Sequence, residues 1–233
     1  MFFASRSLVL LLLASMPAYA AGRPITLTSV DGTVLSGMFY EASPRPAPAV
    51  VLVHMLGRSK DDWGSIAERL EEAGITALAI DLRGHGRSGG SGSELPAMAG
   101  DVRAALSWLA AHPSVRSDAI GLVGASLGAN LVAVAAAESL PGVRAVAMIS
   151  PSLDYRGIRL DAGLNQTLEA IPMWFGASTE DPYALRTIRE LAGDNPLREQ
   201  RLSGVRAHGT RLLSEDSDLA RALVDWLRRT LIF

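Results

Sequence analysis

Nearly continuous apolar runs recur along the chain from Ala49 onward, and polar stretches separate them. The runs cover residues 49–55, 75–82, 119–125, 143–150 and 170–177. They do not alternate between apolar and polar positions, and short continuous runs of this kind are typical of parallel strands buried on both faces. We therefore predict a central sheet in which these five strands run parallel.

Apolar residues at helical spacing lie between the runs. This spacing predicts helices over residues 63–70, 95–109, 127–140 and 219–227, and Asp181-Pro182 predicts the start of another. Gly74 is typical of the residue just after a helix end. Alanine and valine dominate residues 127–140, so we expect that helix to pack tightly on the sheet.

The segment before the first apolar run has a different pattern. Residues 25–41, ITLTSVDGTVLSGMFYE, alternate around Asp31-Gly32, which is a strong signal for an antiparallel hairpin. Three prolines within residues 43–49 then predict a short, stiff connector. A hairpin followed by strand-helix units implies a mostly parallel sheet with helices on both faces, and such sheets place their sites at the carboxyl ends of the strands.

The first twenty residues have the layout of a secretory signal peptide. Arg6 precedes an apolar stretch, Leu8 to Ala14, and Ala18-Tyr19-Ala20 forms a small-x-small ending. The stretch is far shorter than the roughly 20 residues that span a bilayer, which disfavours a permanent anchor. We expect an exported protein, periplasmic or secreted, in which residues 21–233 form one domain.

The composition of the chain indicates which classes of partner and ligand to expect. The chain has 233 residues, of which 48% are hydrophobic, and a formal net charge of −2. A weakly acidic chain without basic runs argues against nucleic acid as a partner and favours a small molecule. With no cysteine in the chain, disulfides, thiolate metal sites and lipid attachment through an N-terminal cysteine are excluded.

Ser126 lies where the third apolar run meets the alanine-rich helix. The stretch GLVGASLG places glycines two residues before and two residues after it. This is the G-x-S-x-G pattern of a nucleophile elbow, with the strand before and the helix after that the pattern requires. The alternative is a glycine-rich turn in which the serine only caps a helix. In an elbow, the hydroxyl is exposed above the sheet and the amide of Leu127 points toward an oxyanion.

A serine nucleophile needs a base, and the chain has four histidines. His112 precedes a proline at a helix end, His85 belongs to a glycine-rich loop, and His54 closes the first parallel strand and could order the next loop. Only His208, in GVRAHGTRLL, lies downstream of both the elbow and a candidate acid. It is our predicted base.

The predicted acid is Asp181, which follows the fifth apolar run. Its alternative role is that of a helix N-cap, common for aspartate before proline. Glu180 is the main rival for the acid and Asp154 a weaker one. The order Ser126, Asp181, His208 is the one expected for a triad built on such an elbow.

These segments resemble the α/β-hydrolase family, and within it small esterase-like and dienelactone-hydrolase-like members. The resemblance covers nearly everything after residue 20 and is strongest in GLVGASLGAN and DLRGHGRS. It implies an α/β-hydrolase fold in which Ser126 is the nucleophile, His208 the general base and Asp181 the group that orients His208. It implies neither a metal nor a cofactor. DLRGHGRS resembles a structural loop of the family, so His85 is not expected to be catalytic.

The resemblance also places the oxyanion hole. One donor would be the amide of Leu127, and the other would be the amide of Met55 or Leu56. Met55 stands where the family usually has glycine, which leaves the second donor open between these two residues.

Only about twenty residues, 151–170, follow the fourth run, where many relatives insert a lid. We expect no lid domain and an open site for small or flexible esters. Tyr155, Trp174 and Met55 could line it, although core or rim packing explains each equally well. The sequence thus predicts an exported serine hydrolase acting on carboxylic esters through an acyl-enzyme. A peptidase, lactone hydrolase or thioester hydrolase could use the same triad, and a non-catalytic binding module is the alternative from another class.

Overall fold

The computed structural model describes residues 22–139 and 142–233. Their strands form an eight-stranded sheet in the order β1-β2-β4-β3-β5-β6-β9-β10. The hairpin β1–β2 joins β4 antiparallel, and the other neighbours are parallel. The strands of this sheet are β1 (Arg23–Thr28), β2 (Val34–Tyr40), β3 (Ala47–Val53), β4 (Thr76–Ile80), β5 (Val115–Ala125), β6 (Ala145–Ile149), β9 (Met173–Ser178) and β10 (Arg198–Ser203).

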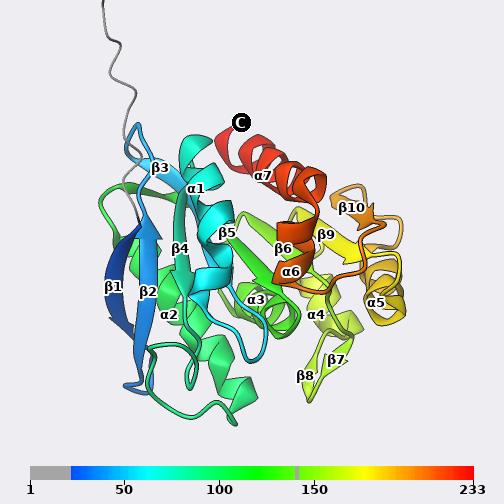
Figure 1. Ribbon diagram of the computed structural model, residues 1–233, viewed down its shortest axis with the longest axis horizontal. Coiled ribbons are helices and arrows are strands. Elements are labelled where there is room, and N and C mark those ends of the chain that lie inside the picture. Colours follow the sequence, from blue (N-terminus) through cyan, green and yellow to red (C-terminus); the bar gives the residue numbers. More distant parts are fainter. Residues whose placement is uncertain (1–21, 140–141) are drawn as a thin grey trace, which may run out of the picture.

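Helices cover both faces of this sheet (Figure 1). One face carries α2 (Met98–Ala111), α3 (Leu127–Glu138) and α5 (Pro182–Ala192). The other carries α1 (Gly64–Glu72), α6 (Thr210–Glu215) and α7 (Ser217–Ile232). Short 3₁₀ turns, Lys60–Trp63 and Leu95–Ala97, precede α1 and α2.

The core explains why the predicted strands read as continuous apolar runs. Along β3, Val51 and Val53 pack under α2 and α3, whereas Val50 and Leu52 pack under α1 and α7. Both sets of side chains are fully buried, so each position of the strand must be apolar. The predicted mostly parallel sheet with an N-terminal hairpin and helices on both faces is confirmed.

The edge strand β10 was not predicted. Its sequence, REQRLS, is polar because the middle of the strand is exposed at the edge of the sheet. An edge strand packed against only one neighbour needs no continuous apolar run. The strand nevertheless matters for the site, since it leads directly into the segment that carries His208.

The short segment between β6 and β9 folds without adding a layer. It forms a two-stranded ribbon, β7 (Asp154–Tyr155) and β8 (Ile158–Arg159), and one short helix, α4 (Ala162–Thr167). In the described part of the chain, every helix is too short or too polar to cross a bilayer. The predicted signal peptide, residues 1–20, lies outside the described residues.

Two glycines allow α3 to begin directly above the sheet. A Cβ atom on Gly124 would lie 2.1 Å from the carbonyl oxygen of Gly128, and one on Gly128 would lie 2.3 Å from the carbonyl oxygen of Val53. Both distances are much shorter than a van der Waals contact. The atoms that would be met belong to the backbone of α3 at Gly124 and to the backbone of β3 at Gly128. Any side chain at either position would therefore push α3 away from β3 and β5.

We expect Gly128→Ala to destabilise the protein by about 1–3 kcal/mol or more, because the added methyl group overlaps rigid backbone. Thermal unfolding measures the effect. Gly163→Ala is the matched control, because a Cβ atom there would meet only the side chain of Asp161 at 3.4 Å on the exposed helix α4. An equal fall of melting temperature in both variants would contradict the packing argument.

Candidate active site

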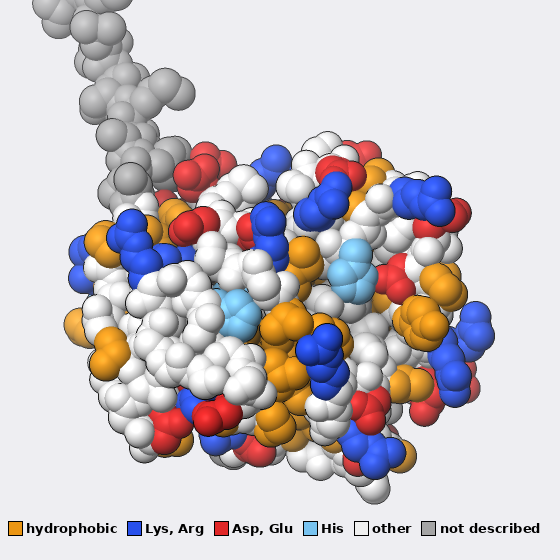
Figure 2. Space-filling view, turned by 60° about the horizontal axis from the view of Figure 1, so that its bottom comes forward, with side chains coloured by type: hydrophobic (Ala, Val, Ile, Leu, Met, Phe, Trp, Pro, Cys, Tyr) orange, Lys and Arg blue, Asp and Glu red, His pale blue; other side chains and the backbone are white. Residues whose placement is uncertain are grey.

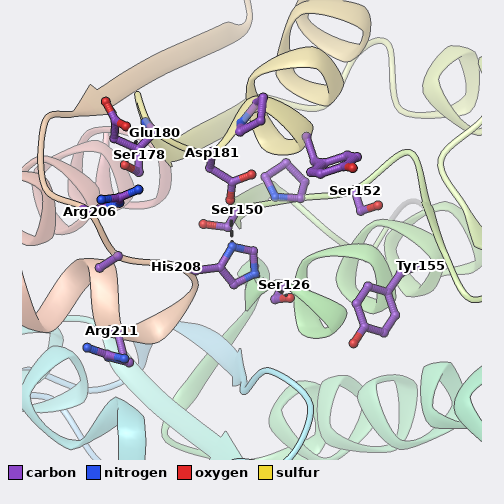
Figure 3. Close-up of a pocket in the computed structure, with 14 residues that line it drawn as sticks. Ser126, Ser150, Ser152, Tyr155, Ser178, Glu180, Asp181, Arg206, His208 and Arg211 are labelled. Carbon is purple, nitrogen blue, oxygen red and sulfur yellow. Dashed lines mark hydrogen bonds and ion pairs between the residues drawn. The ribbon is translucent and has the colours of Figure 1, made fainter.

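Ser126 is held in a strained turn between β5 and α3. Its φ of 51° and ψ of −116° lie in a region that non-glycine residues rarely adopt. The amide nitrogen of Ser126 donates to the carbonyl oxygen of Ile149 at 2.8 Å, which extends the pairing of β5 with β6 by one residue. The strained conformation is thus held between the strand before the residue and the helix after it. The side chain reaches the pocket drawn in Figure 3.

His208 bridges Ser126 and Asp181, although the three residues are far apart in the sequence. Its Nε2 lies 2.9 Å from Oγ of Ser126, and its Nδ1 lies 2.7 Å from Oδ2 of Asp181 (Figure 3). A carboxylate only accepts, so the proton on the ring is placed on Nδ1. Nε2 is then free to accept the proton of the serine hydroxyl.

Asp181 performs both of the roles that its sequence context allows. One carboxylate oxygen contacts His208, and the other accepts from the amide of Ala184 at 3.0 Å as the N-cap of α5. The cap fixes the carboxylate that faces the histidine. The structure gives neither rival acid a contact with His208: Glu180 is exposed, and Asp154 accepts from the amide of Gly157 in the β7–β8 turn.

The remaining histidines have contacts of other kinds. His112 is the C-cap of α2, as expected. Nδ1 of His85 lies 2.9 Å from the carbonyl oxygen of Arg83, so it bonds to its own loop, as expected. His54 is buried, and its Nε2 accepts from the amide of Leu82 at 3.0 Å.

His54 therefore orders the loop after β3. Because Nε2 is an acceptor, the ring proton is on Nδ1, which donates to the carbonyl oxygen of Met55 at 2.8 Å. This contact fixes the peptide between Met55 and Leu56, and the trans geometry of that peptide directs the Leu56 amide away from His54. Burial lowers the pKa of His54 to about 4, even though the bond to Met55 opposes the shift.

A buried ion pair, Lys60 with Asp81, also holds the loop after β3. Asp81 at the end of β4 accepts from both Nζ and the amide of Lys60, each at 2.8 Å, and also from the amide of Arg87 at 3.0 Å. Burial alone would raise the pKa of Asp81, but these hydrogen bonds lower it below its usual range. The carboxylate thereby ties the loop after β3 to the loop after β4.

A second bridge joins that loop to the histidine segment. Asp62, which Arg58 also contacts at 2.7 Å, accepts from Oγ1 of Thr210 at 2.6 Å. Thr210 starts α6 just two residues after His208. This contact was not predicted, because no local pattern in the sequence pairs Asp62 with a residue as distant as Thr210.

The pocket beside Ser126 has a volume of about 600 Å³. Tyr155 lines it, as the sequence suggested, together with Pro151, Pro182 and Tyr183. Figure 2 shows hydrophobic side chains gathered between and below two histidine side chains that are visible on one face of the molecule. Charged side chains at the pocket come from Glu180, Asp181, Arg206 and Arg211.

Trp174 does not line this pocket, so that prediction is wrong. The side chain is fully buried in the cluster on the α1 and α7 face of the sheet. Trp174 is the second residue of β9, and Ser178, at the carboxyl end of the strand, lines the pocket instead. Met55 does not line it either. Its side chain lies against Gly209, where its Sδ would be only 2.5 Å from an added Cβ atom. It packs against the turn after His208.

The fold and site together place the chain among the α/β hydrolases. The family model described as serine aminopeptidase, S33, matches residues 44–192. The chain belongs to this family, as the sequence resemblance predicted.

Curated relatives share part of their length with this chain. Over 137 residues the chain is 31% identical to polyketide transferase grgF of a Penicillium species, which covers 57% of this chain and 46% of the relative. Over 157 residues it is 29% identical to uncharacterized protein YfhR of Salmonella typhimurium, which covers 61% and 53%. The chain thus spans about half the length of the curated relatives it matches.

Solved structures extend the likeness of fold over nearly the whole chain. The Pyrococcus furiosus esterase Pf2001 aligns with a TM-score of 0.74 and 18% identity, covering 90% of this chain and 91% of the other. A dienelactone hydrolase from Anabaena variabilis aligns with a TM-score of 0.71 and 19% identity, covering 91% and 100%. At such identities the likeness establishes the fold alone.

We expect the stability of the protein to fall between pH 6.5 and pH 4 because of His54. The folded state keeps this ring neutral down to a pKa of about 4, whereas the unfolded chain protonates it near 6.5. The unfolded state therefore binds more protons in this window, and its protonation costs roughly 3 kcal/mol of stability in total. The loss is absent above the window and complete below it.

His54→Gln tests this expectation, because the amide oxygen can accept from Leu82 but does not titrate. Urea unfolding at pH 7 and at pH 4.5 should show a stability loss that is smaller by about 2–3 kcal/mol in the variant than in the natural protein. The same loss in both proteins would contradict the role given to His54. The Asp31 carboxyl, whose pKa Arg83 lowers to about 2, titrates below this window in the folded state.

Proposed function

We propose that the protein is a serine hydrolase that cleaves small carboxylic esters through an acyl-enzyme on Ser126. The observation that carries the proposal is the continuous hydrogen-bond path from Ser126 through His208 to Asp181, with contacts of 2.9 Å and 2.7 Å. Membership of a hydrolase family supports the same conclusion.

The chemistry follows from the donor and acceptor roles in this path. Nε2 of His208 takes the proton as Oγ of Ser126 attacks the ester carbonyl, and Asp181 stabilises the resulting imidazolium. His208 then delivers the proton to the departing alcohol. A water molecule repeats the sequence on the acyl-enzyme and releases the acid, and Ser126 recovers its proton.

The oxyanion formed on attack needs donors opposite His208. We assign them to the amides of Leu127 and Leu56. Leu127 is the first residue of α3, and within residues 22–139 and 142–233 its amide has no hydrogen-bond acceptor. The amides of Leu56 and Met55 likewise have none there. The bond from His54 to the Met55 carbonyl oxygen fixes the peptide of the Leu56 amide, and this contact favours Leu56. Preorganised donors of this kind stabilise developing charge without reorganising during the reaction.

Export is part of the proposal and is supported by the sequence of residues 1–20. The same triad could act on a peptide, a lactone or a thioester. The relatives include an esterase and a polyketide transferase by name. A hydrolase-fold binding module is disfavoured because none of the three triad positions is lost.

A fluorophosphonate probe tests the nucleophile. We expect the folded protein to be labelled once, and Ser126→Ala to abolish labelling and to lower kcat by several orders of magnitude. Asp181→Asn keeps a good helix cap, so it should lower kcat by about 10⁴-fold while leaving the melting temperature nearly unchanged.

Ser114→Ala is the matched control, since Ser114 is also buried but bonds His112 at the end of α2. It should be labelled like the natural protein. Undiminished labelling of Ser126→Ala, or no labelling of the folded natural protein, would exclude the proposed mechanism. A ligand that still raised the melting temperature would then favour a binding module.

The open pocket predicts a preference for short acyl chains. Residues 151–172 add only a ribbon and a short helix, so within the described residues no extended apolar channel covers Ser126. A series of p-nitrophenyl esters from acetate to palmitate should show the highest kcat/KM for the short members, with lactones and aminoacyl amides as comparison substrates. A clear preference for long chains would contradict the assignment to small esters.

A further inference from the structure

Ser150 shares two backbone features with the nucleophile, one strand further along the sheet: a positive φ and a strand-end hydrogen bond. It follows the end of β6, its φ is 51°, and its amide donates to the carbonyl oxygen of Gly176 at 2.8 Å. In the same way, the amide of Ser126 donates to Ile149 on β6. Both serines continue the sheet pairing by one residue and then turn into a conformation that favours glycine.

The hydroxyl of Ser150 holds the residue next to the proposed base. Oγ accepts from the amide of Gly209 at 3.1 Å, and Ser150 is only 1% exposed. Gly209 has a φ of 62° and directly follows His208. Figure 3 shows the Ser150 side chain beside His208, as the bond to Gly209 requires. The hydrogen bond therefore fixes the main chain at the point where the histidine side chain leaves it.

Packing alone does not explain a serine at this position. Glycine would adopt the positive φ without strain, as Gly209 does across the bond. Serine keeps the strain and supplies the acceptor that the buried Gly209 amide needs. Strain that persists at a pocket is a reason to look for a function of the residue.

We propose that Ser150 is a positioning residue that holds His208 in line between Ser126 and Asp181. The inference rests on the proposed function. The bond from Gly209 sets the position of the His208 backbone, and the Asp62–Thr210 contact secures the next residue of the same segment. Ser150 itself takes no part in the proton transfers.

Two variants separate the hydroxyl from the strain. Ser150→Ala removes the hydroxyl and keeps the strained backbone, whereas Ser150→Gly removes the hydroxyl and relieves the strain. We expect Ser150→Gly to be the more stable of the two in thermal unfolding. We expect both to lower kcat by about 10- to 100-fold with little change of KM, because a small displacement of a catalytic group has effects of this size.

The rate of fluorophosphonate labelling should fall by a similar factor in both variants, because labelling also requires His208 to activate Ser126. Ser114→Ala, a buried serine outside the site, should keep the natural rate. A Ser150→Gly protein with natural kcat, or activities that follow the order of melting temperatures, would overturn the positioning role. So would an effect confined to KM.

These outcomes differ from a failure of the proposed function. If the natural protein is not labelled at all, the serine mechanism itself is wrong. If the natural protein and both Ser150 variants are labelled at the same rate, the mechanism stands and only the role of Ser150 is excluded.

Discussion

The close approach of α3 to the sheet is the constraint on which the site depends. The helix begins so near β3 and β5 that neither Gly124 nor Gly128 has room for a side chain. The chain passes from strand to helix in this space through a residue with positive φ, which is Ser126. The position of the serine side chain at the pocket and the orientation of the Leu127 amide both follow from this turn.

Support for the site comes from polar residues that hold its loops, of which Asp81 and His54 are buried and Asp62 is half-buried. Asp81 joins the loops after β3 and β4, His54 fixes the peptide after Met55, and Asp62 joins the loop after β3 to the histidine segment. Each carries several hydrogen bonds, as buried polar groups must. Loops are flexible by default, so catalytic geometry at the carboxyl ends of strands requires such cross-links.

Single side chains in this site combine structural and chemical roles. Asp181 caps α5 with one oxygen and contacts His208 with the other. The thioether of Met55 fills the space beside Gly209. The helix-cap role and the catalytic role of Asp181 are not alternatives, because a carboxylate has enough acceptor positions for both.

The sequence by itself determined most of the sheet, the elbow, and Ser126 and His208 as partners in the hydrogen-bond path, with Asp181 preferred to its neighbour Glu180 as the acid. Its strands are buried on both faces, and a glycine pattern around one serine marks a turn that few other sequences can form. Strand β10 was not predicted, because its middle residues face water and it has no apolar run. Trp174 was wrongly placed in the pocket, because an apolar run does not show on which face of the sheet each residue packs. Only the tertiary structure decided that Asp181 rather than Glu180 contacts His208, and that Ser150, Asp62 and Lys60 support the site. Such contacts join residues far apart in the chain, and local sequence patterns carry no information about which distant partners will meet.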